Sequence, residues 1–383
     1  MKNNRQSSPG LYLHVPFCKT KCPYCDFYSI TDQSGRAAWL EAVAAEAELY
    51  RGVFDSEKSF GPFETLYLGG GTPSLFEENE IRTLFECISA AFTFAPGAEI
   101  TIEANPDDVT PAKLAAWRDL GVNRVSLGVQ SFDDAELRFL RRRHDAARAE
   151  RSIAEIRAAG FTNVGLDFLY GFEGQSLASW ERTLERALAF APEHLSCYQM
   201  TIAPETEFGR MRAAGSLAAA DEETERLFFM RTAEIIRGRG YLHYEISNFA
   251  RGGSFISRHN NKYWIHAPYL GLGPAAHSFD GAARWWNVHS VEEYCRSLEK
   301  GGSPAGGRET LSDEELAFET IYLGLRTREG VPLEAIQRCV GWRITLDALL
   351  GESLATVENG RLLPTLRGFS LADRIALAFA PRS

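Results

Sequence analysis

The sequence has 383 residues, of which 45% are apolar and 24% charged, and its formal net charge is −10. This acidic balance argues against a protein whose main task is to bind nucleic acid. No apolar run reaches the roughly 18 residues that a membrane span needs, and residues 1–9 lack the apolar core of a secretory signal. We therefore expect a soluble protein of two or more domains in a reducing cytoplasm.

Strand and helix patterns alternate through the first half of the chain. Expected strands are Leu11–Val15, Thr65–Leu68, Glu99–Glu103, Asn123–Val129, Val164–Phe168 and His194–Thr201. Expected helices are Ala37–Tyr50, Glu78–Ala91, Pro111–Leu120, Asp133–Leu140, Ala146–Ala159 and Trp180–Phe190. Such repetition predicts an α/β fold with a parallel sheet and outer helices. Six units are too few for a closed eight-stranded barrel, so we expect a partial (β/α)6 barrel over residues 11–220, after an N-terminal tail at 1–10.

The rest of the chain divides differently. A helix at Asp221–Arg239 and a stretch rich in aromatic residues and histidine form an expected barrel extension over 221–300, and the glycine-rich run 301–307 is typical of a linker. Residues 308–383 predict a helical, winged-helix-like domain, with a hairpin that turns at Asn359-Gly360. Its helices are expected at Ser312–Arg326, Leu333–Val340 and Leu371–Phe379.

Three cysteines directly follow the first strand: Cys18, Cys22 and Cys25 have the spacing CxxxCxxC. Thiolates select zinc, copper(I) or iron–sulfur clusters. A structural zinc site needs a fourth ligand nearby, and His14 is poorly placed for that because it lies on the strand. A 4Fe–4S cluster normally takes four thiolates, so three leave one iron open to a chelating small molecule. The alternative is three unrelated structural thiols.

The cysteine spacing resembles that of the radical S-adenosylmethionine (SAM) enzymes, in which the amino and carboxylate groups of SAM chelate the open iron. The next strand ends in Gly69-Gly70-Gly71-Thr72-Pro73, which is similar to a SAM-binding turn in those enzymes. The resemblance implies that Gly70, Gly71 and Thr72 contact SAM. Glycine lets a backbone approach a ligand closely, although the run also suits a plain tight turn.

Polar residues stand at or near the ends of the later strands. Glu103 and Gln130 each end a strand, Asp167 lies in another, and Arg142 lies in an arginine-rich loop. Ligands of parallel sheets bind at the carboxyl ends of the strands, although capping or ion pairing would also explain such residues. The resemblance implies that SAM contacts Tyr12, Tyr24, Glu103, Gln130, Arg142 and Asp167.

Longer matches narrow the family. Gly-Val-Gln-Ser-Phe, Leu-Asp-Phe-Leu-Tyr-Gly and Tyr269–His277 look like the oxygen-independent coproporphyrinogen oxidase superfamily. That superfamily contains coproporphyrinogen III dehydrogenases and HemW-type haem chaperones. The dehydrogenases have a further cysteine where this chain has Phe27, and a longer arm than the ten residues before Leu11. His259–Trp264 resembles the HNxxYW motif of the chaperones, in which the histidine is linked to haem.

The resemblance implies a chaperone that holds a 4Fe–4S cluster, SAM and haem and delivers haem to an acceptor protein. His259 is the expected haem ligand, because a neutral imidazole is a common axial ligand of haem iron; its alternative is a packed core histidine. We also expect a location in the cytoplasm or at the inner face of a membrane, no nucleic-acid partner, and a homodimer as one form of assembly. The alternative function is an anaerobic coproporphyrinogen III dehydrogenase.

Overall fold

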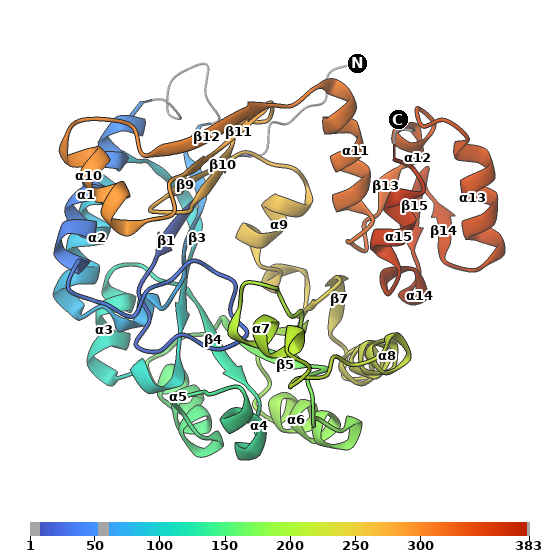
Figure 1. Ribbon diagram of the computed structural model, residues 1–383, viewed down its shortest axis with the longest axis horizontal. Helices are drawn as coiled ribbons and strands as arrows, with labels where there is room; N and C mark the ends of the chain where they lie inside the picture. Colours follow the sequence, from blue (N-terminus) through green and yellow to red (C-terminus); the bar gives the residue numbers. More distant parts are fainter. Residues whose placement is uncertain (1–7, 53–60, 381–383) are drawn as a thin grey trace. The chain divides into compact units, whose positions relative to one another are not determined.

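The computed structural model describes residues 8–52 and 61–380 (Figure 1). Residues 1–7 of the expected N-terminal tail lie outside the described part. The chain forms two compact units, each assembled from separate segments. The first unit contains Met1–Phe168, Thr201–Ala218 and Ala267–Thr310, and the second contains Leu169–Met200, Ala219–His266 and Leu311–Ser383. The predicted boundaries at 220, 300 and 308 stay a prediction.

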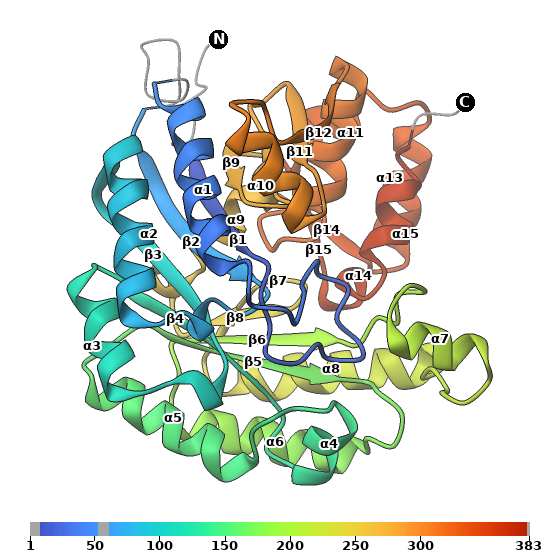
Figure 2. The same cartoon turned by 60° about the vertical axis from the view of Figure 1, so that its left-hand side comes forward.

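A parallel sheet forms the centre of the first unit. Its strands lie side by side in chain order because each is followed by a helix that returns the chain to the same edge. They are β1 (Gly10–Val15), β2 (Phe63–Gly70), β3 (Phe94–Ala104), β4 (Arg124–Gln130) and β5 (Val164–Tyr170). The helices are α1 (Arg36–Tyr50), α2 (Glu78–Ala91), α3 (Pro111–Asp119), α4 (Asp134–Phe139) and α5 (Ala146–Ala158), with short 3-10 turns at Pro73–Leu75 and Pro106–Asp108. Figures 1 and 2 show α1, α2, α3 and α5 along the outer side of these strands. The predicted α/β alternation is confirmed.

The sheet continues on the other side of β1. There β9 (Tyr269–Leu272) pairs parallel with β1, and β10 (His277–Phe279), β11 (Ala283–Asn287) and β12 (Ala305–Thr310) follow antiparallel. Helices α7 (Glu207–Ala213) and α10 (Val291–Glu299) complete the unit. The linker prediction is wrong for residues 305–307, which begin β12. A side chain at Gly307 would collide with the Trp286 indole, so this glycine serves close packing between strands.

One buried carboxyl joins distant segments of the first unit. Glu46, on α1, accepts hydrogen bonds from the backbone N–H of Gly273, from Asn287 Nδ2 and from the Tyr294 hydroxyl. Burial raises the pKa of Glu46 to about 7, although all three hydrogen bonds act to lower it. The carboxyl therefore fixes α1 against the residue that follows β9, against β11 and against α10, and its pKa stays close to neutral pH.

The second unit contains helices, the last three strands of the 12-stranded sheet order and a separate three-stranded sheet. It contains α6 (Leu177–Ala189), α8 (Glu222–Gly238), α9 (Arg258–Trp264), a 3-10 turn at Gly253–Phe255, and the antiparallel strands β6 (His194–Gln199), β8 (Asn248–Ala250) and β7 (Leu242–Glu245). Within the described residues, no helix combines the length and the apolar character needed to cross a membrane.

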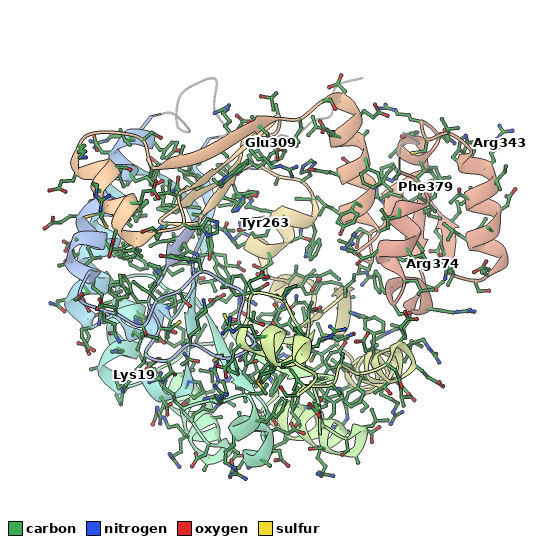
Figure 3. All side chains as sticks on the ribbon, in the orientation of Figure 1. Lys19, Tyr263, Glu309, Arg343, Arg374 and Phe379 are labelled. Carbon is green, nitrogen blue, oxygen red and sulfur yellow. The ribbon has the colours of Figure 1, made fainter. Side chains whose placement is uncertain are left out.

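The C-terminal part of this unit has its own core, which includes Ile321, Val331, Ile336 and Leu362. Its helices are α11 (Asp313–Gly324), α12 (Leu333–Ile336), α13 (Trp342–Gly351), α14 (Leu366–Phe369) and α15 (Ala372–Leu377). Figure 3 labels Arg343 on α13, Arg374 on α15, and Phe379 just after α15. Its strands β13 (Val331–Pro332), β15 (Arg361–Pro364) and β14 (Ala355–Glu358) form one sheet. Asn359 and Gly360 both have positive φ, as a two-residue hairpin turn requires. The predicted helical domain with a hairpin is confirmed.

Candidate cofactor site

The three cysteines lie in one loop that closes on itself after β1. The backbone of Cys18 bonds to the Ile30 carbonyl at 2.9 Å, and the N–H of Ile30 returns to the Pro16 carbonyl at 2.8 Å. Cys18 is buried, whereas Cys22 and Cys25 are partly exposed. Burial raises the pKa of the Cys25 thiol to about 11.

The spacing of potential ligands bears on the kind of metal centre. Among residues 8–52 and 61–380, no three His, Cys, Asp or Glu side chains gather closely enough to hold a single metal ion. A four-iron cluster binds each thiolate through a different iron, so its thiolates stand farther apart than the ligands of one zinc ion.

The glycine run after β2 lies directly against this loop. Gly71 donates to the Val15 carbonyl at 2.7 Å, and Thr72 donates to the Phe17 carbonyl at 2.8 Å. A Cβ at Gly71 would lie 2.7 Å from the same two carbonyl oxygens, so only glycine permits this approach. The Thr72 hydroxyl donates to Cys18 Sγ at 3.4 Å. The turn and the cysteine loop thus form one structural unit.

The side chains of His14 and Tyr12, both on β1, are hydrogen-bonded to each other. His14 Nε2 bonds to the Tyr28 carbonyl at 2.8 Å, which requires a proton on Nε2, and Nδ1 then accepts from the Tyr12 hydroxyl at 3.1 Å. Burial lowers the pKa of His14 to about 4, so the ring is neutral at pH 7. Because both nitrogens are engaged, His14 is not available as a fourth metal ligand.

Two carboxylates approach the site from β3 and β5. Glu103 accepts from the Tyr67 hydroxyl at 2.7 Å and from the N–H of Gly70 at 3.2 Å, and Asp167 accepts from the Ser126 hydroxyl at 2.8 Å. Burial raises the pKa of Glu103 to about 7, and the charge of Asp167 adds to that rise. A carboxylate in this state favours a ligand that donates hydrogen bonds.

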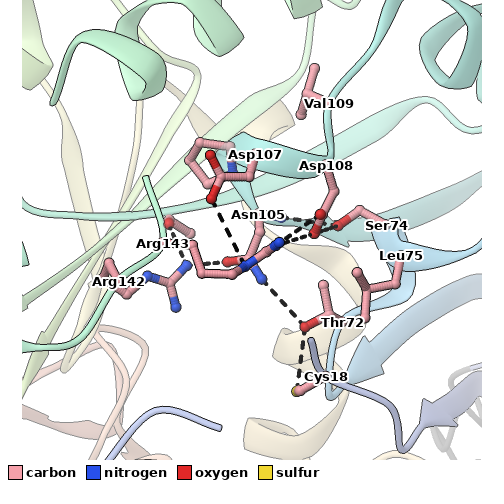
Figure 4. Close-up of polar contacts among 12 residues, drawn as sticks. Cys18, Thr72, Ser74, Leu75, Asn105, Asp107, Asp108, Val109, Arg142 and Arg143 are labelled. Atoms are coloured by element: carbon pink, nitrogen blue, oxygen red, sulfur yellow. Dashed lines mark hydrogen bonds and ion pairs between the residues drawn. The ribbon is translucent and has the colours of Figure 1, made fainter. Parts of the chain in front are cut away.

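Arg142 is a partly buried cation near these groups. The side chains of Gln130 and Arg142 both lie against Gly128, where the lack of a Cβ leaves room for them. A Cβ at Gly128 would lie 3.0 Å from Gln130 Nε2 and 3.5 Å from Arg142 Nη2. Arg142 donates to Asn105 Oδ1 (Figure 4). It also donates to the Gly128 carbonyl at 3.1 Å and to Cys22 Sγ at 3.4 Å.

Arg142 also has unused bonding capacity. Its Nε is buried without a hydrogen-bond partner, and it pairs with no carboxylate in the described part of the chain. The pKa of Arg142 lies above its ordinary value: burial acts to lower it, but the Tyr24 phenol and the Cys22 thiol outweigh burial. A partly buried cation is stabilised by a neighbouring anion, and a thiolate-bound cluster or a ligand carboxylate would supply one.

Sequence reasoning missed three residues that hold the predicted ones in place, namely Tyr67, Asn105 and Ser126. The alternation of side chains along each strand could have revealed two of them. Tyr67 pairs in register with Tyr12 across β1 and β2, and Ser126 pairs with Glu103 across β3 and β4. Side chains at paired positions point to the same face of a sheet. Asn105 lies in the loop after β3, and no sequence pattern connects it with its partners.

His259 lies in the second unit and is described separately from the cysteine site. It is on α9, 1% exposed, and its Nε2 bonds to the Tyr263 hydroxyl at 2.9 Å. Figure 3 labels Tyr263 on the same helix. Burial lowers the pKa of His259 to about 3, so the imidazole is neutral, the form that coordinates iron. Its role as a haem ligand stays a prediction.

Comparison with known proteins identifies the family. Residues 12–187 match the model of the Radical SAM superfamily, and residues 311–371 match the HemN C-terminal domain. The chain is 36% identical over 370 residues to the protein named Heme chaperone HemW in Mycobacterium tuberculosis, covering 96% of this chain and 93% of that one. The chain belongs to the HemW family.

A second HemW relative, from Synechocystis, is 34% identical over 96% of this chain and 86% of its own length. The fold of this HemW-family chain is also that of coproporphyrinogen III oxidase (HemN) from Escherichia coli, a radical SAM enzyme. The TM-score is 0.82 at 22% identity, over 98% of this chain and 91% of the other. The predicted family and fold class are thereby confirmed. Membership of the radical SAM superfamily implies a 4Fe–4S cluster and SAM as cofactors.

Proposed function

We propose that this chain is a haem chaperone: it binds a 4Fe–4S cluster, SAM and haem, and delivers haem to an acceptor protein. Similarity over nearly the whole chain to proteins named Heme chaperone HemW carries this proposal. A match of this length includes the cysteine loop, the glycine run and α9 together, so the cofactor site and the haem motif belong to one proposal.

The cluster is assigned to Cys18, Cys22 and Cys25. Thr72 and Arg142 support the assignment, because both direct donors at cysteine sulfurs and Arg142 has no carboxylate partner in the described residues. With three thiolates, the fourth iron would stay open, and bound SAM would supply its amino and carboxylate groups there.

The SAM contacts implied by the family resemblance are part of the same proposal, and the geometry of several of these residues supports it. Glu103 suits the ribose hydroxyls, since its carboxylate accepts hydrogen bonds, and the positive charge of Arg142 suits an anionic group. The backbone of the glycine run approaches a ligand without steric hindrance. The full proposed set is Tyr12, Tyr24, Gly70, Gly71, Thr72, Glu103, Gln130, Arg142 and Asp167.

Haem is assigned to His259. The neutral imidazole supports this, and coordination through Nε2 would require that nitrogen to release the Tyr263 hydroxyl. Delivery at the inner face of a membrane, a cytoplasmic location and a homodimer stay predictions from the sequence.

Anaerobic reconstitution with iron and sulfide tests the proposal. The wild-type chain should take up a cluster, Cys18→Ser, Cys22→Ser and Cys25→Ser should each prevent or strongly reduce uptake, and added haemin should produce a Soret band. With SAM and a reductant, coproporphyrinogen III should remain unchanged. Formation of protoporphyrinogen would instead assign the dehydrogenase activity, and a wild-type chain that binds no haemin would refute the chaperone.

A further inference from the structure

Two of the three cysteines are linked by a continuous chain of side-chain hydrogen bonds, and Figure 4 draws the part of it from Cys18 to Arg142. From Cys18 the chain passes to the Thr72 hydroxyl at 3.4 Å, and from Thr72 to Asn105 Nδ2 at 3.3 Å. The other end of the Asn105 amide, Oδ1, accepts from Arg142, whose second guanidinium nitrogen lies 3.4 Å from Cys22 Sγ. Asn105 is thus the middle of a relay between two sulfurs.

The Asn105 amide sets the direction of every bond in this relay. Its Nδ2 occupies a lone pair of the Thr72 oxygen, which leaves the Thr72 hydroxyl proton free to point at Cys18. Its Oδ1 binds one nitrogen of Arg142 and leaves the other directed at Cys22. A carboxylate at this position only accepts, so it would compete with Cys18 for the hydroxyl proton and draw the guanidinium away from Cys22.

A second set of contacts fixes the backbone of Asn105. Its N–H donates to the Ser74 hydroxyl at 3.0 Å, and that hydroxyl donates to Asp108 Oδ2 at 3.3 Å. Arg143 holds both oxygens of Asp108 at 2.8 Å. The amide is therefore held at both its backbone and its side chain, as a residue that positions metal ligands requires.

We propose that Asn105 is a positioning residue for the cluster, which directs the Thr72 hydroxyl and the Arg142 guanidinium at the sulfurs of Cys18 and Cys22. This inference rests on the proposed cluster. Donors directed at sulfur stabilise the more negative, reduced state of an iron–sulfur cluster, so they raise its reduction potential and slow the loss of iron. The same bonds tie the glycine turn, and with it the SAM site, to the cysteine loop.

The isosteric substitution Asn105→Asp tests this role. We expect the cluster of the variant to be harder to reduce, with the ratio of reduced to oxidised cluster at a given potential lower by about tenfold, which is about 59 mV for a one-electron couple. Iron should be lost to a chelator about tenfold faster. The measurements are an anaerobic redox titration followed by electron paramagnetic resonance and the kinetics of iron release. Neither depends on activity.

Asn123→Asp is the matched control. Asn123 also uses both ends of its amide, donating to the Ala98 carbonyl at 2.8 Å and accepting from the N–H of Ile100 at 3.0 Å, but it contacts no residue of the relay. Thr72→Val is the second test variant, because it removes the donor to Cys18 without adding charge. Thr72→Val should lower the reduction potential of the cluster less than Asn105→Asp does. The variant that carries both substitutions should have the same reduction potential as Asn105→Asp alone.

The outcomes separate this inference from the proposed function. Should wild-type protein take up no cluster, the proposed function fails, and the relay with it. A cluster that forms in every chain, with the same potential and iron-release rate in Asn105→Asp and Thr72→Val as in wild type, overturns the relay alone. Equal shifts in reduction potential and in iron-release rate for Asn105→Asp and the control Asn123→Asp would also overturn the relay. If Asn105→Asp forms no cluster while its cluster-free chain unfolds at the wild-type temperature and the control loads normally, the relay is supported.

Discussion

The Tyr67 hydroxyl donates a 2.7 Å hydrogen bond to Glu103 Oε1, across the neighbouring strands β2 and β3. This bond favours the ionised carboxylate, yet burial still raises the pKa of Glu103 to about 7. The charge of a residue proposed to bind SAM is therefore decided within the physiological pH range. Tyr67 determines how much of the carboxylate is ionised there.

Tyr67→Phe should raise the pKa of Glu103 further, because a hydrogen bond to the charged form is lost. A bond of this kind is worth about one pKa unit or more, so the ionised fraction at pH 7 should fall from about a half to about a tenth. Affinity for SAM should then fall about fivefold at pH 7 and recover at pH 9. Calorimetric titration of the reconstituted protein at both pH values measures this.

The control for that change is Tyr50→Phe. The Tyr50 hydroxyl bonds to Trp285 Nε1 at 2.9 Å and contacts none of the proposed SAM residues. It should leave the pH dependence of SAM binding unaltered. Equal affinity of wild type and Tyr67→Phe at all pH values would show that the charge of Glu103 does not contribute to binding.

The parallel strands and their helices were predictable because local signals agree with the fold. Helix α2 begins and ends as predicted, at Glu78 and Ala91, since Glu77 and Glu80 form a capping box before an amphipathic run. Helix α9, by contrast, has seven residues and is started by Ser257, and a stretch so short has little periodicity to recognise. The strands β9–β12 were missed for the same reason, since they have three to six residues each.

The candidate site was predictable in part. The cysteine loop and the glycine run are local patterns, so their chemistry can be inferred from spacing. Their supporting contacts join residues far apart in the chain: Thr72 meets Cys18 across 54 positions, and Arg142 meets Cys22 across 120. Nothing in the local sequence of Asn105 indicates which donors it orients. Those contacts depend on strand order and register, which only the folded chain defines.

Gly70→Ala should destabilise the first unit by about 2–4 kcal/mol. Gly70 has φ +101°, and a Cβ there would lie 2.6 Å from the His14 ring, so backbone strain and a steric clash combine. Gly97→Ala is the matched control, because Gly97 has φ +72° with no atom within 4 Å of the new Cβ. It should cost only the strain, about 1–2 kcal/mol. Urea unfolding compares the two, and equal losses would exclude the clash.

Glu46→Gln should change how stability depends on pH. The folded chain holds the pKa of Glu46 near 7, above the ordinary 4.5 of the unfolded chain, because burial disfavours the charge. The contribution of the protonated Glu46 carboxyl to the free energy of unfolding is therefore complete below about pH 4.5 and is lost as the pH rises through 7. Since Gln does not titrate, the advantage of wild type over the variant in free energy of unfolding should shrink by about 2–3 kcal/mol between pH 5 and pH 8.

Urea unfolding at pH 5 and pH 8 measures this difference, with Glu86→Gln as the control because Glu86 lies exposed on α2. The control should follow the wild-type pH dependence. If Glu46→Gln shows the same pH dependence as well, the folded chain does not raise the pKa of Glu46.

Tyr263→Phe should strengthen haem binding, whereas His259→Ala should weaken it. The His259 imidazole has to release the Tyr263 hydroxyl, 2.9 Å away, before that nitrogen coordinates iron. Removing a hydrogen bond worth about 1 kcal/mol should increase haemin affinity about fivefold, while Phe keeps the flat apolar ring. Haemin titrations followed at the Soret band measure both variants.

The control is Tyr241→Phe, because the Tyr241 hydroxyl donates to the Pro192 carbonyl at 2.6 Å. This control variant should bind haemin like wild type. Unchanged affinity in both Tyr263→Phe and His259→Ala would exclude this imidazole as the haem ligand.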